Sequence, residues 1–166
     1  MWPEFELETM LERLSFAGVD YVVIGGIAMV AHGSARLTRD LDIVFAPDDR
    51  NLELLGEVLL DLDAKLRGVE DEVPFVPDAA RLGNVEMLTL ATSAGWLDLH
   101  RRPAGAPPYG SLRRHAERVD LGAYSVLVAS PADLQAMKRT AARPQDVIDL
   151  EYLEAIIRLR RERGVR

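Results

Sequence analysis

The segment GGIAMVAHGSARLTRDLDI, residues 25–43, is the most informative part of the sequence because it joins a double glycine to an Asp-x-Asp pair. The apolar, β-branched run Tyr21–Ile24 precedes it and predicts a buried strand that the double glycine ends. Residues 27–32 then predict a short helix packed on that strand. Asp40 and Asp42 alternate with apolar residues, which predicts a second strand with both carboxylates on one face.

Hydrophobic patterns on both sides of this stretch predict further helices and strands. Apolar residues at helical spacing predict helices, and β-branched or alternating runs between turn residues predict strands. The expected elements are helices over residues 4–16, 27–32 and 48–62, strands over 21–24, 41–45, 85–92 and 96–99, a hairpin over 119–128, and loops over 68–77 and 103–110.

Two helices are expected at the C-terminal end of the chain. Ser130 before Pro131 is a typical helix start, and Arg143-Pro144 separates this helix from a second one. The second helix is expected to bury one apolar face, formed by Val147, Leu150, Leu153, Ile156 and Ile157.

Composition excludes several classes of site. With Cys 0 among 166 residues, the chain has no disulfide, thiolate metal site or cysteine nucleophile, so a metal would need oxygen ligands or one of its three histidines. The net charge of -7 argues against a generally basic nucleic-acid-coating protein. Arginines clustered in the second half of the chain are still compatible with a local basic groove. Without a long apolar segment or a basic, signal-like start, we expect a cytoplasmic protein that does not enter membranes.

An Asp-x-Asp pair at the start of a strand can hold hard divalent cations such as Mg²⁺, because alternation aims both carboxylates at one point. The pair alone is weak evidence, since Asp61-Leu62-Asp63 repeats it on a predicted helix, where the carboxylates would point apart. The context of Asp40 and Asp42 differs, because Gly25-Gly26 would let backbone N–H groups approach a phosphate. Asp98, between Leu97 and Leu99, adds a third acidic strand position.

The segment from Gly25 to Ile43 resembles the nucleotidyltransferase superfamily of the polymerase-β type. Within it, the chain is most similar to small prokaryotic proteins related to the AbiEii-type toxins, which commonly carry two glycines where other branches carry Gly-Ser. The resemblance extends to Lys138 and to the segment from Arg143 to Leu150. It implies an α+β fold with a mixed β-sheet flanked by helices. The catalytic core would span residues 1–129, and helices in residues 130–166 would pack on it as one compact unit.

The resemblance also implies roles for individual residues. Asp40, Asp42 and Asp98 would bind Mg²⁺ or Mn²⁺, and a nucleoside triphosphate (NTP) would be the substrate. Lys138 would neutralise its phosphates, and Asp146 would complete or orient the site. The implied catalytic residues are Asp40, Asp42, Asp98, Lys138 and Asp146, and the implied nucleotide-binding residues are Gly25, Gly26, Thr38, Arg39 and Arg143.

The implied reaction is attack by a hydroxyl on the α-phosphorus of the NTP, with pyrophosphate leaving. The acceptor is open: RNA, in particular the 3′ end of tRNA, modified by a toxin that pairs with an antitoxin protein; a protein hydroxyl; or a small molecule. A catalytically silent nucleotide-binding or antitoxin-like partner is a different class of function, and a plain structural α/β domain is a further alternative.

Each site residue also has a structural interpretation. The double glycine could form only a turn, and Asp42 and Asp98 could be surface carboxylates. Lys138 and Asp146 could be charges on a helix surface. Other structural interpretations are a helix-end role for His32, core positions for Trp2 and Trp96, and a carboxylate contact for Arg143. Arg36 and Arg39 could be either phosphate contacts or plain surface residues.

Overall fold

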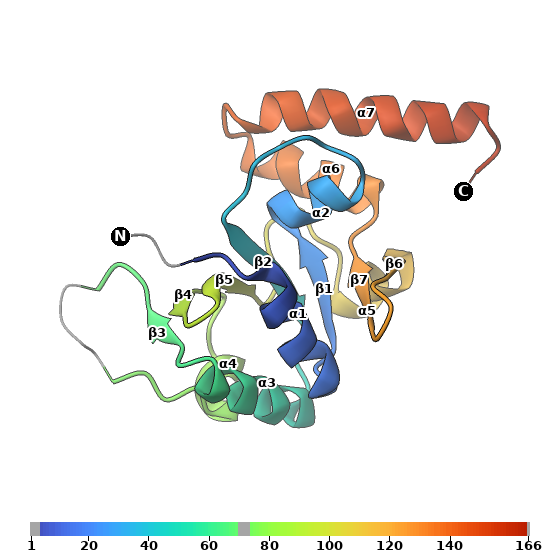
Figure 1. The fold of residues 1–166 in the computed structure, drawn as a ribbon. Coiled ribbons are helices and arrows are strands. Elements are labelled where there is room, and N and C mark those ends of the chain that lie inside the picture. Colours follow the sequence, from blue (N-terminus) through green and yellow to red (C-terminus); the bar gives the residue numbers. More distant parts are fainter. Residues whose placement is uncertain (1–3, 70–73, 166) are drawn as a thin grey trace.

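The computed structural model describes residues 4–69 and 74–165, so Trp2 and part of the expected loop over residues 68–77 lie outside the described residues. The described residues form a mixed β-sheet flanked by helices (Figure 1). The strands are β1 (Tyr21–Ile24), β2 (Asp40–Phe45), β3 (Lys65–Leu66), β4 (Met87–Thr92), β5 (Gly95–His100), β6 (Glu117–Asp120) and β7 (Ser125–Val128). The helices are α1 (Leu7–Phe16), α2 (Gly25–Ala31), α3 (Asp49–Asp61), α4 (Ala79–Gly83), α5 (Tyr109–His115), α6 (Pro131–Ala141) and α7 (Asp146–Glu162).

The strand order in the described sheet is β3-β4-β5-β2-β1-β7-β6. β2 runs parallel to β5 and antiparallel to β1, and β1 runs parallel to β7. The expected α+β class with a mixed sheet is therefore confirmed. The parallel pairing of β2 with β5 sets Asp42 directly beside Asp98, so two distant segments bring their carboxylates to neighbouring positions.

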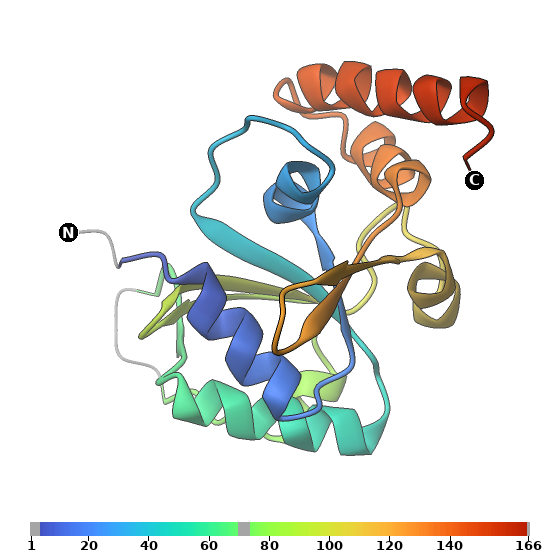
Figure 2. The ribbon, with the colours of Figure 1, turned by 45° about the vertical axis from the view of Figure 1, so that its right-hand side comes forward.

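Two groups of helices lie at opposite ends of the central strands of the sheet. Both views show α2, α6 and α7 gathered beyond one end, while α3 and α4 lie beyond the other (Figures 1 and 2). The core lies between the sheet and the helices that pack on it, including α1, and burial of its apolar side chains provides the main stabilisation. Its largest fully buried side chains include Met10, Leu14, Met29, Leu41, Ile43, Phe45, Leu55, Leu59, Leu97 and Leu99.

Local signals in the sequence correctly place two helix starts. The Asp48 side chain accepts a hydrogen bond from Asn51 N at the start of α3, and Ser130 accepts one from Asp133 N at the start of α6. These contacts satisfy backbone donors that the first turn of a helix leaves unpaired. No helix among residues 4–69 and 74–165 is long and apolar enough to cross a membrane.

The structure corrects three sequence expectations. The short elements β3 and α4 were not expected, and α5 begins inside the expected loop over residues 103–110. Their segments are too short to show a hydrophobic period. The expected apolar face of α7 is wrong at its start, because Val147 is 56% exposed whereas Asp146 and Asp149 are buried; Leu153 is buried as expected.

Candidate active site

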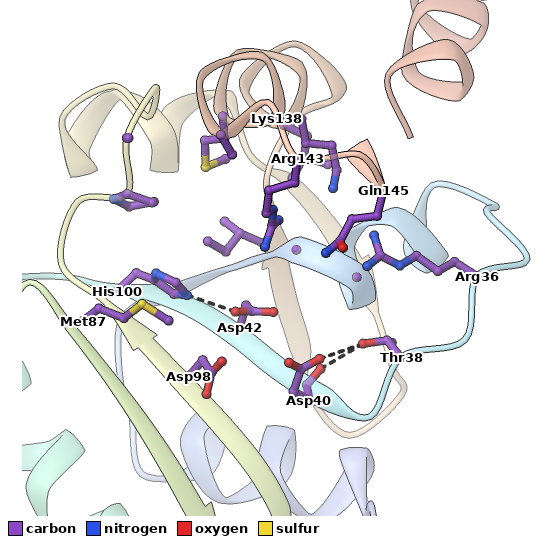
Figure 3. A pocket seen from close by; sticks show the side chains of 18 residues that line it. Arg36, Thr38, Asp40, Asp42, Met87, Asp98, His100, Lys138, Arg143 and Gln145 are labelled. Carbon is purple, nitrogen blue, oxygen red and sulfur yellow. Dashed lines mark hydrogen bonds and ion pairs between the residues drawn. The ribbon is translucent and has the colours of Figure 1, made fainter. Parts of the chain in front are cut away.

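A cavity of about 390 Å³ lies where β2 and β5 meet α2, α6 and the start of α7 (Figure 3). Most of the predicted site residues line it. Arg39 is exposed and is not among the lining residues, and Asp146 is fully buried behind them. The predicted residues that do line the cavity are Gly25, Gly26, Thr38, Asp40, Asp42, Asp98, Lys138 and Arg143.

The strands bring the carboxylates to this cavity. Asp40 and Asp42 occupy alternate positions on β2, and Figure 3 shows both side chains at the same cavity as Asp98. Asp98 is the partner of Asp42 in the parallel register, and its side chain is only 7% exposed. The sheet therefore places acidic side chains from adjacent strands on one wall of the cavity.

Each of these carboxylates has a different partner. Thr38 Oγ1 donates to Asp40 Oδ1 at 2.9 Å, and His100 Nε2 forms a hydrogen bond of 3.0 Å with Asp42 Oδ1. Arg67 Nη2 donates to both oxygens of Asp98, at 3.0 and 3.1 Å. Within the described ranges, no three His, Cys, Asp or Glu side chains converge as a ready-made ligand cluster.

The electrostatics of Asp98 show how closely negative charge is packed here. The pKa of Asp98 is raised to about 6, first by burial and then by the charges of Asp42 and Asp40, while Arg67 acts in the opposite direction. Carboxylate oxygens are the ligands that Mg²⁺ and Mn²⁺ prefer, and a divalent cation would relieve the repulsion between Asp40, Asp42 and Asp98. The residues present therefore fit such a cation.

The start of α2 packs so closely against β2, and against the loop that precedes β2, that only glycine fits at its first two positions. Gly25 has φ +65°, and a Cβ atom there would lie 2.5 Å from Asp42 Oδ2. A Cβ atom on Gly26 would lie 2.7 Å from Thr38 Oγ1. The glycines thus allow Asp42 and Thr38 to pack directly against the start of α2, which is a structural reason for them besides the predicted approach of a phosphate.

A network of charged groups forms the wall of the cavity opposite the sheet. Lys138 Nζ lies 2.6 Å from Asp149 Oδ2 and 3.3 Å from Asp146 Oδ1. Arg143 donates to Asp146 from its backbone N and from Nε, and Arg36 pairs with Asp149. The expected carboxylate contact of Arg143 is therefore present. The alternative that Lys138 and Asp146 are surface charges is wrong, because they are 6% and 0% exposed.

This network keeps Asp146 ionised although it is buried. Burial alone would raise the pKa of Asp146, but hydrogen bonds from Arg143 and the charge of Lys138 outweigh it and lower the pKa below its ordinary value. The Lys138 ammonium faces two carboxylates, whereas the Arg143 side chain remains 58% exposed at the cavity. The exposed guanidinium of Arg143 is therefore more accessible to a ligand in the cavity than the buried ammonium of Lys138.

Sequence reasoning missed several residues at the site. His100 lies two positions after Asp98 on β5, so strand alternation could have placed it on the same face. Gln145 and Met87 also line the cavity, and Figure 3 labels both. Arg67 offers no local signal, because its contact with Asp98 spans 31 residues.

Two expectations concern residues near the site. His32 has the expected structural role, because its Nε2 forms a hydrogen bond of 2.9 Å with the Ala129 carbonyl. Trp96 was expected in the core; it is half-buried, and the Arg67 guanidinium stacks 4.4 Å from the centre of its ring.

Comparison with solved structures shows the same fold in nucleotidyltransferases. The lincosamide antibiotic adenylyltransferase LnuA, bound to lincomycin, matches with a TM-score of 0.60 and 20% identity over 91% of this chain and 96% of that chain. The antibiotic-resistance factor ANT(2'')-Ia matches with a TM-score of 0.55 and 15% identity, over 94% and 91% of the two chains. An antigenic nucleotidyltransferase-like protein from Paracoccidioides brasiliensis gives 0.51 and 18%, over 90% and 74%.

Sequence comparison identifies the family. None of the curated proteins matches the chain. A family model described as "Nucleotidyl transferase AbiEii toxin, Type IV TA system" matches residues 9–163, a range that includes every predicted site residue. The chain therefore belongs to the AbiEii nucleotidyl transferase toxin family and is a nucleotidyltransferase.

Proposed function

We propose that the cavity transfers a nucleoside monophosphate from an NTP to an acceptor hydroxyl, with a divalent cation held by Asp40, Asp42 and Asp98. One observation gives this proposal its main support. Carboxylates from two adjacent parallel strands face a cavity whose opposite wall presents Arg36 and Arg143 (Figure 3). Such a site offers cation ligands on one side and phosphate ligands on the other, as transfer of a charged phosphate group requires.

In the proposed reaction, the acceptor oxygen forms a bond with the α-phosphorus while the bond to the bridging oxygen of pyrophosphate breaks. The hydroxyl proton leaves with the help of Asp98, the most buried of the three carboxylates. A bound Mg²⁺ or Mn²⁺ would supply charge stabilisation to the transferred phosphate and would lower the pKa of the attacking hydroxyl. No covalent intermediate with the protein is needed.

The other cavity residues bind and orient the triphosphate. Gly25 and Gly26 at the start of α2, and Thr38 just before β2, hold the β- and γ-phosphates, because these segments pack closely together at the cavity. Arg36 and Arg143 contribute positive charge from the opposite wall. In this assignment Lys138 acts mainly by holding Asp146 and Asp149, which in turn fix the two arginines.

RNA is the proposed acceptor, in particular the 3′ end of tRNA, and the protein would act as a toxin controlled by an antitoxin protein. The family description names a toxin of a toxin–antitoxin system, which supports this role. Exposed arginines outside the cavity can contact a phosphate backbone. They include Arg101, Arg102, Arg158, Arg161 and Arg163.

A small molecule is the second candidate acceptor. LnuA and ANT(2'')-Ia are antibiotic-modifying or antibiotic-resistance proteins of the same fold. In this chain apolar groups that could contact an apolar ring also line the cavity; they include Met87, Pro103, Ala104 and Met137. A catalytically silent nucleotide-binding partner is disfavoured, because such a protein would not need three carboxylates at one cavity.

Incubation with each of the four NTPs, labelled at the α-phosphate, together with Mg²⁺ or Mn²⁺ and total RNA tests the acceptor. We expect one or more nucleotides to label the RNA and the label to be removed by ribonuclease. The Asp42→Asn variant serves as the inactive control. Label found only in protein would overturn the RNA assignment, and label found only in added small hydroxyl compounds would favour the second candidate.

A further inference from the structure

An ion pair between Arg67 and Asp98 connects the proposed metal site to the edge of the sheet. Arg67 Nη2 donates to both oxygens of Asp98, at 3.0 and 3.1 Å, and the two side chains are 25% and 7% exposed. Arg67 is not among the residues that line the cavity. The carboxylate that faces the cavity is thus also held by a cation that is not part of the cavity wall.

The sheet fixes this arginine in place. Arg67 directly follows β3, and its backbone N donates to the Thr89 carbonyl on β4 at 2.9 Å. Thr89 is the register partner of Asp98 on β5, so the backbone contact and the ion pair occur at the same level of the sheet. The guanidinium also stacks on Trp96, which lies two residues before Asp98 and therefore on the same face of β5.

In the part of the chain that the structure describes, the side-chain hydrogen bonds of the Arg67 guanidinium are both to Asp98. Its Nη1 is buried and has no hydrogen-bond partner among the described residues, whereas Nη2 contacts both carboxylate oxygens. Asp40 and Asp42 are paired differently, with the Thr38 hydroxyl and the His100 ring. Among the described residues, Arg67 is therefore the permanently charged side chain that forms an ion pair with one of the three carboxylates, Asp98.

A fixed positive charge on a metal ligand has two opposing effects. It holds the carboxylate in one orientation, and it repels a second cation that approaches the same oxygens. Both oxygens of Asp98 already accept a hydrogen bond from Arg67, so a metal ion must share one of them with Arg67 or displace it.

We propose that Arg67 is an internal counter-ion that positions Asp98 and weakens the binding of divalent cations to the free protein. The inference rests on the proposed function, because it takes Asp98 as a metal ligand. Its consequence is that the metal binds tightly only when the triphosphate supplies further oxygen ligands. Arg67 is thus a positioning residue that acts through Asp98 and does not itself touch the nucleotide.

Direct Mn²⁺ binding, measured by calorimetry without nucleotide, tests this role. Arg67→Met keeps an unbranched apolar stem against Trp96 but removes the charge, and it should lower the Kd for Mn²⁺ by roughly tenfold. Arg67→Lys keeps the charge and should stay within about threefold of the parent. Arg81→Met removes an exposed arginine that pairs with Asp78, so it should leave the Kd unchanged.

A second set of variants makes the outcome specific to Asp98. In an Asp98→Asn background, Arg67→Met should no longer change Mn²⁺ binding, because the carboxylate that couples the two is gone. If Arg67→Met does not fold, Arg67→Gln provides a second neutral side chain that can still donate to Asp98, and the same tighter binding is expected.

Unchanged or weaker Mn²⁺ binding by the neutral variants would overturn the role of Arg67, as would an effect that persists beside Asp98→Asn. If the parent protein binds Mn²⁺ and Asp42→Asn abolishes this binding, the proposed metal site stands whatever the Arg67 variants show. If the parent binds no Mn²⁺ even with triphosphate present, the metal dependence of the proposed function fails and the role of Arg67 fails with it.

Discussion

Replacing Asp42 by Asn is expected to lower nucleotide transfer by at least about a thousandfold, because loss of a metal ligand removes several kcal/mol of transition-state stabilisation. Asp42 is at the centre of the site. It pairs with Asp98 across the parallel register, packs against Gly25 and contacts His100. Melting temperature should not fall, because the substitution removes one of several neighbouring negative charges.

The chain supplies a matched control for this substitution. Asp61 belongs to the second Asp-x-Asp pair, but it lies exposed at the end of α3, outside the cavity. Asp61→Asn should therefore leave transfer and stability unchanged within about twofold and about 0.5 kcal/mol. Transfer by Asp42→Asn at a rate similar to that of Asp61→Asn would show that the cavity is not the active site.

Replacing Lys138 by Met is expected to lower the free energy of unfolding by about 3 kcal/mol, because it leaves buried carboxylates without their shared cation. Lys138 Nζ lies 3.3 Å from Asp146, which is fully buried, and 2.6 Å from Asp149. Arg143 and Arg36 remain as partners and compensate only in part. Urea unfolding measures the change.

Arg139→Met is the control for this second substitution. Arg139 is the next residue on α6, and its pair with Glu154 is 59% exposed on both sides. Exposed pairs contribute little, so this variant should lose less than about 0.5 kcal/mol. A loss of under about 1 kcal/mol for Lys138→Met would mean that the buried network is not needed to hold α7 on α6.

The parts of the site that the sequence predicted are those encoded by short patterns. Alternation over Asp40-Leu41-Asp42 predicts a shared face without knowledge of any neighbouring strand, and the structure places both carboxylates at one cavity. The double glycine could be recognised in the same way. Asp98 was found because apolar residues flank it on a strand. That it lies beside Asp42 depends on the parallel pairing of β2 with β5, which neither segment reveals alone.

The parts that the sequence did not predict depend on contacts between distant residues. Asp146 and Asp149 are buried because Lys138 and Arg36 meet them, and Arg36 is 113 residues away from Asp149. A hydrophobic pattern assigns such acidic residues to the surface, which is why the buried face of α7 was misplaced. The contact of Arg67 with Asp98 was missed for the same reason.

The proposed reaction transfers a nucleoside monophosphate at this cavity with the help of a divalent cation. The most direct measurement compares NTPs labelled at the α-phosphate and at the γ-phosphate. We expect the α-label to enter the acceptor only when Mg²⁺ or Mn²⁺ is present, and the γ-label to appear in pyrophosphate. Transfer of the γ-label to the acceptor, or transfer of the α-label without a divalent cation, would show that the cavity does not catalyse this reaction.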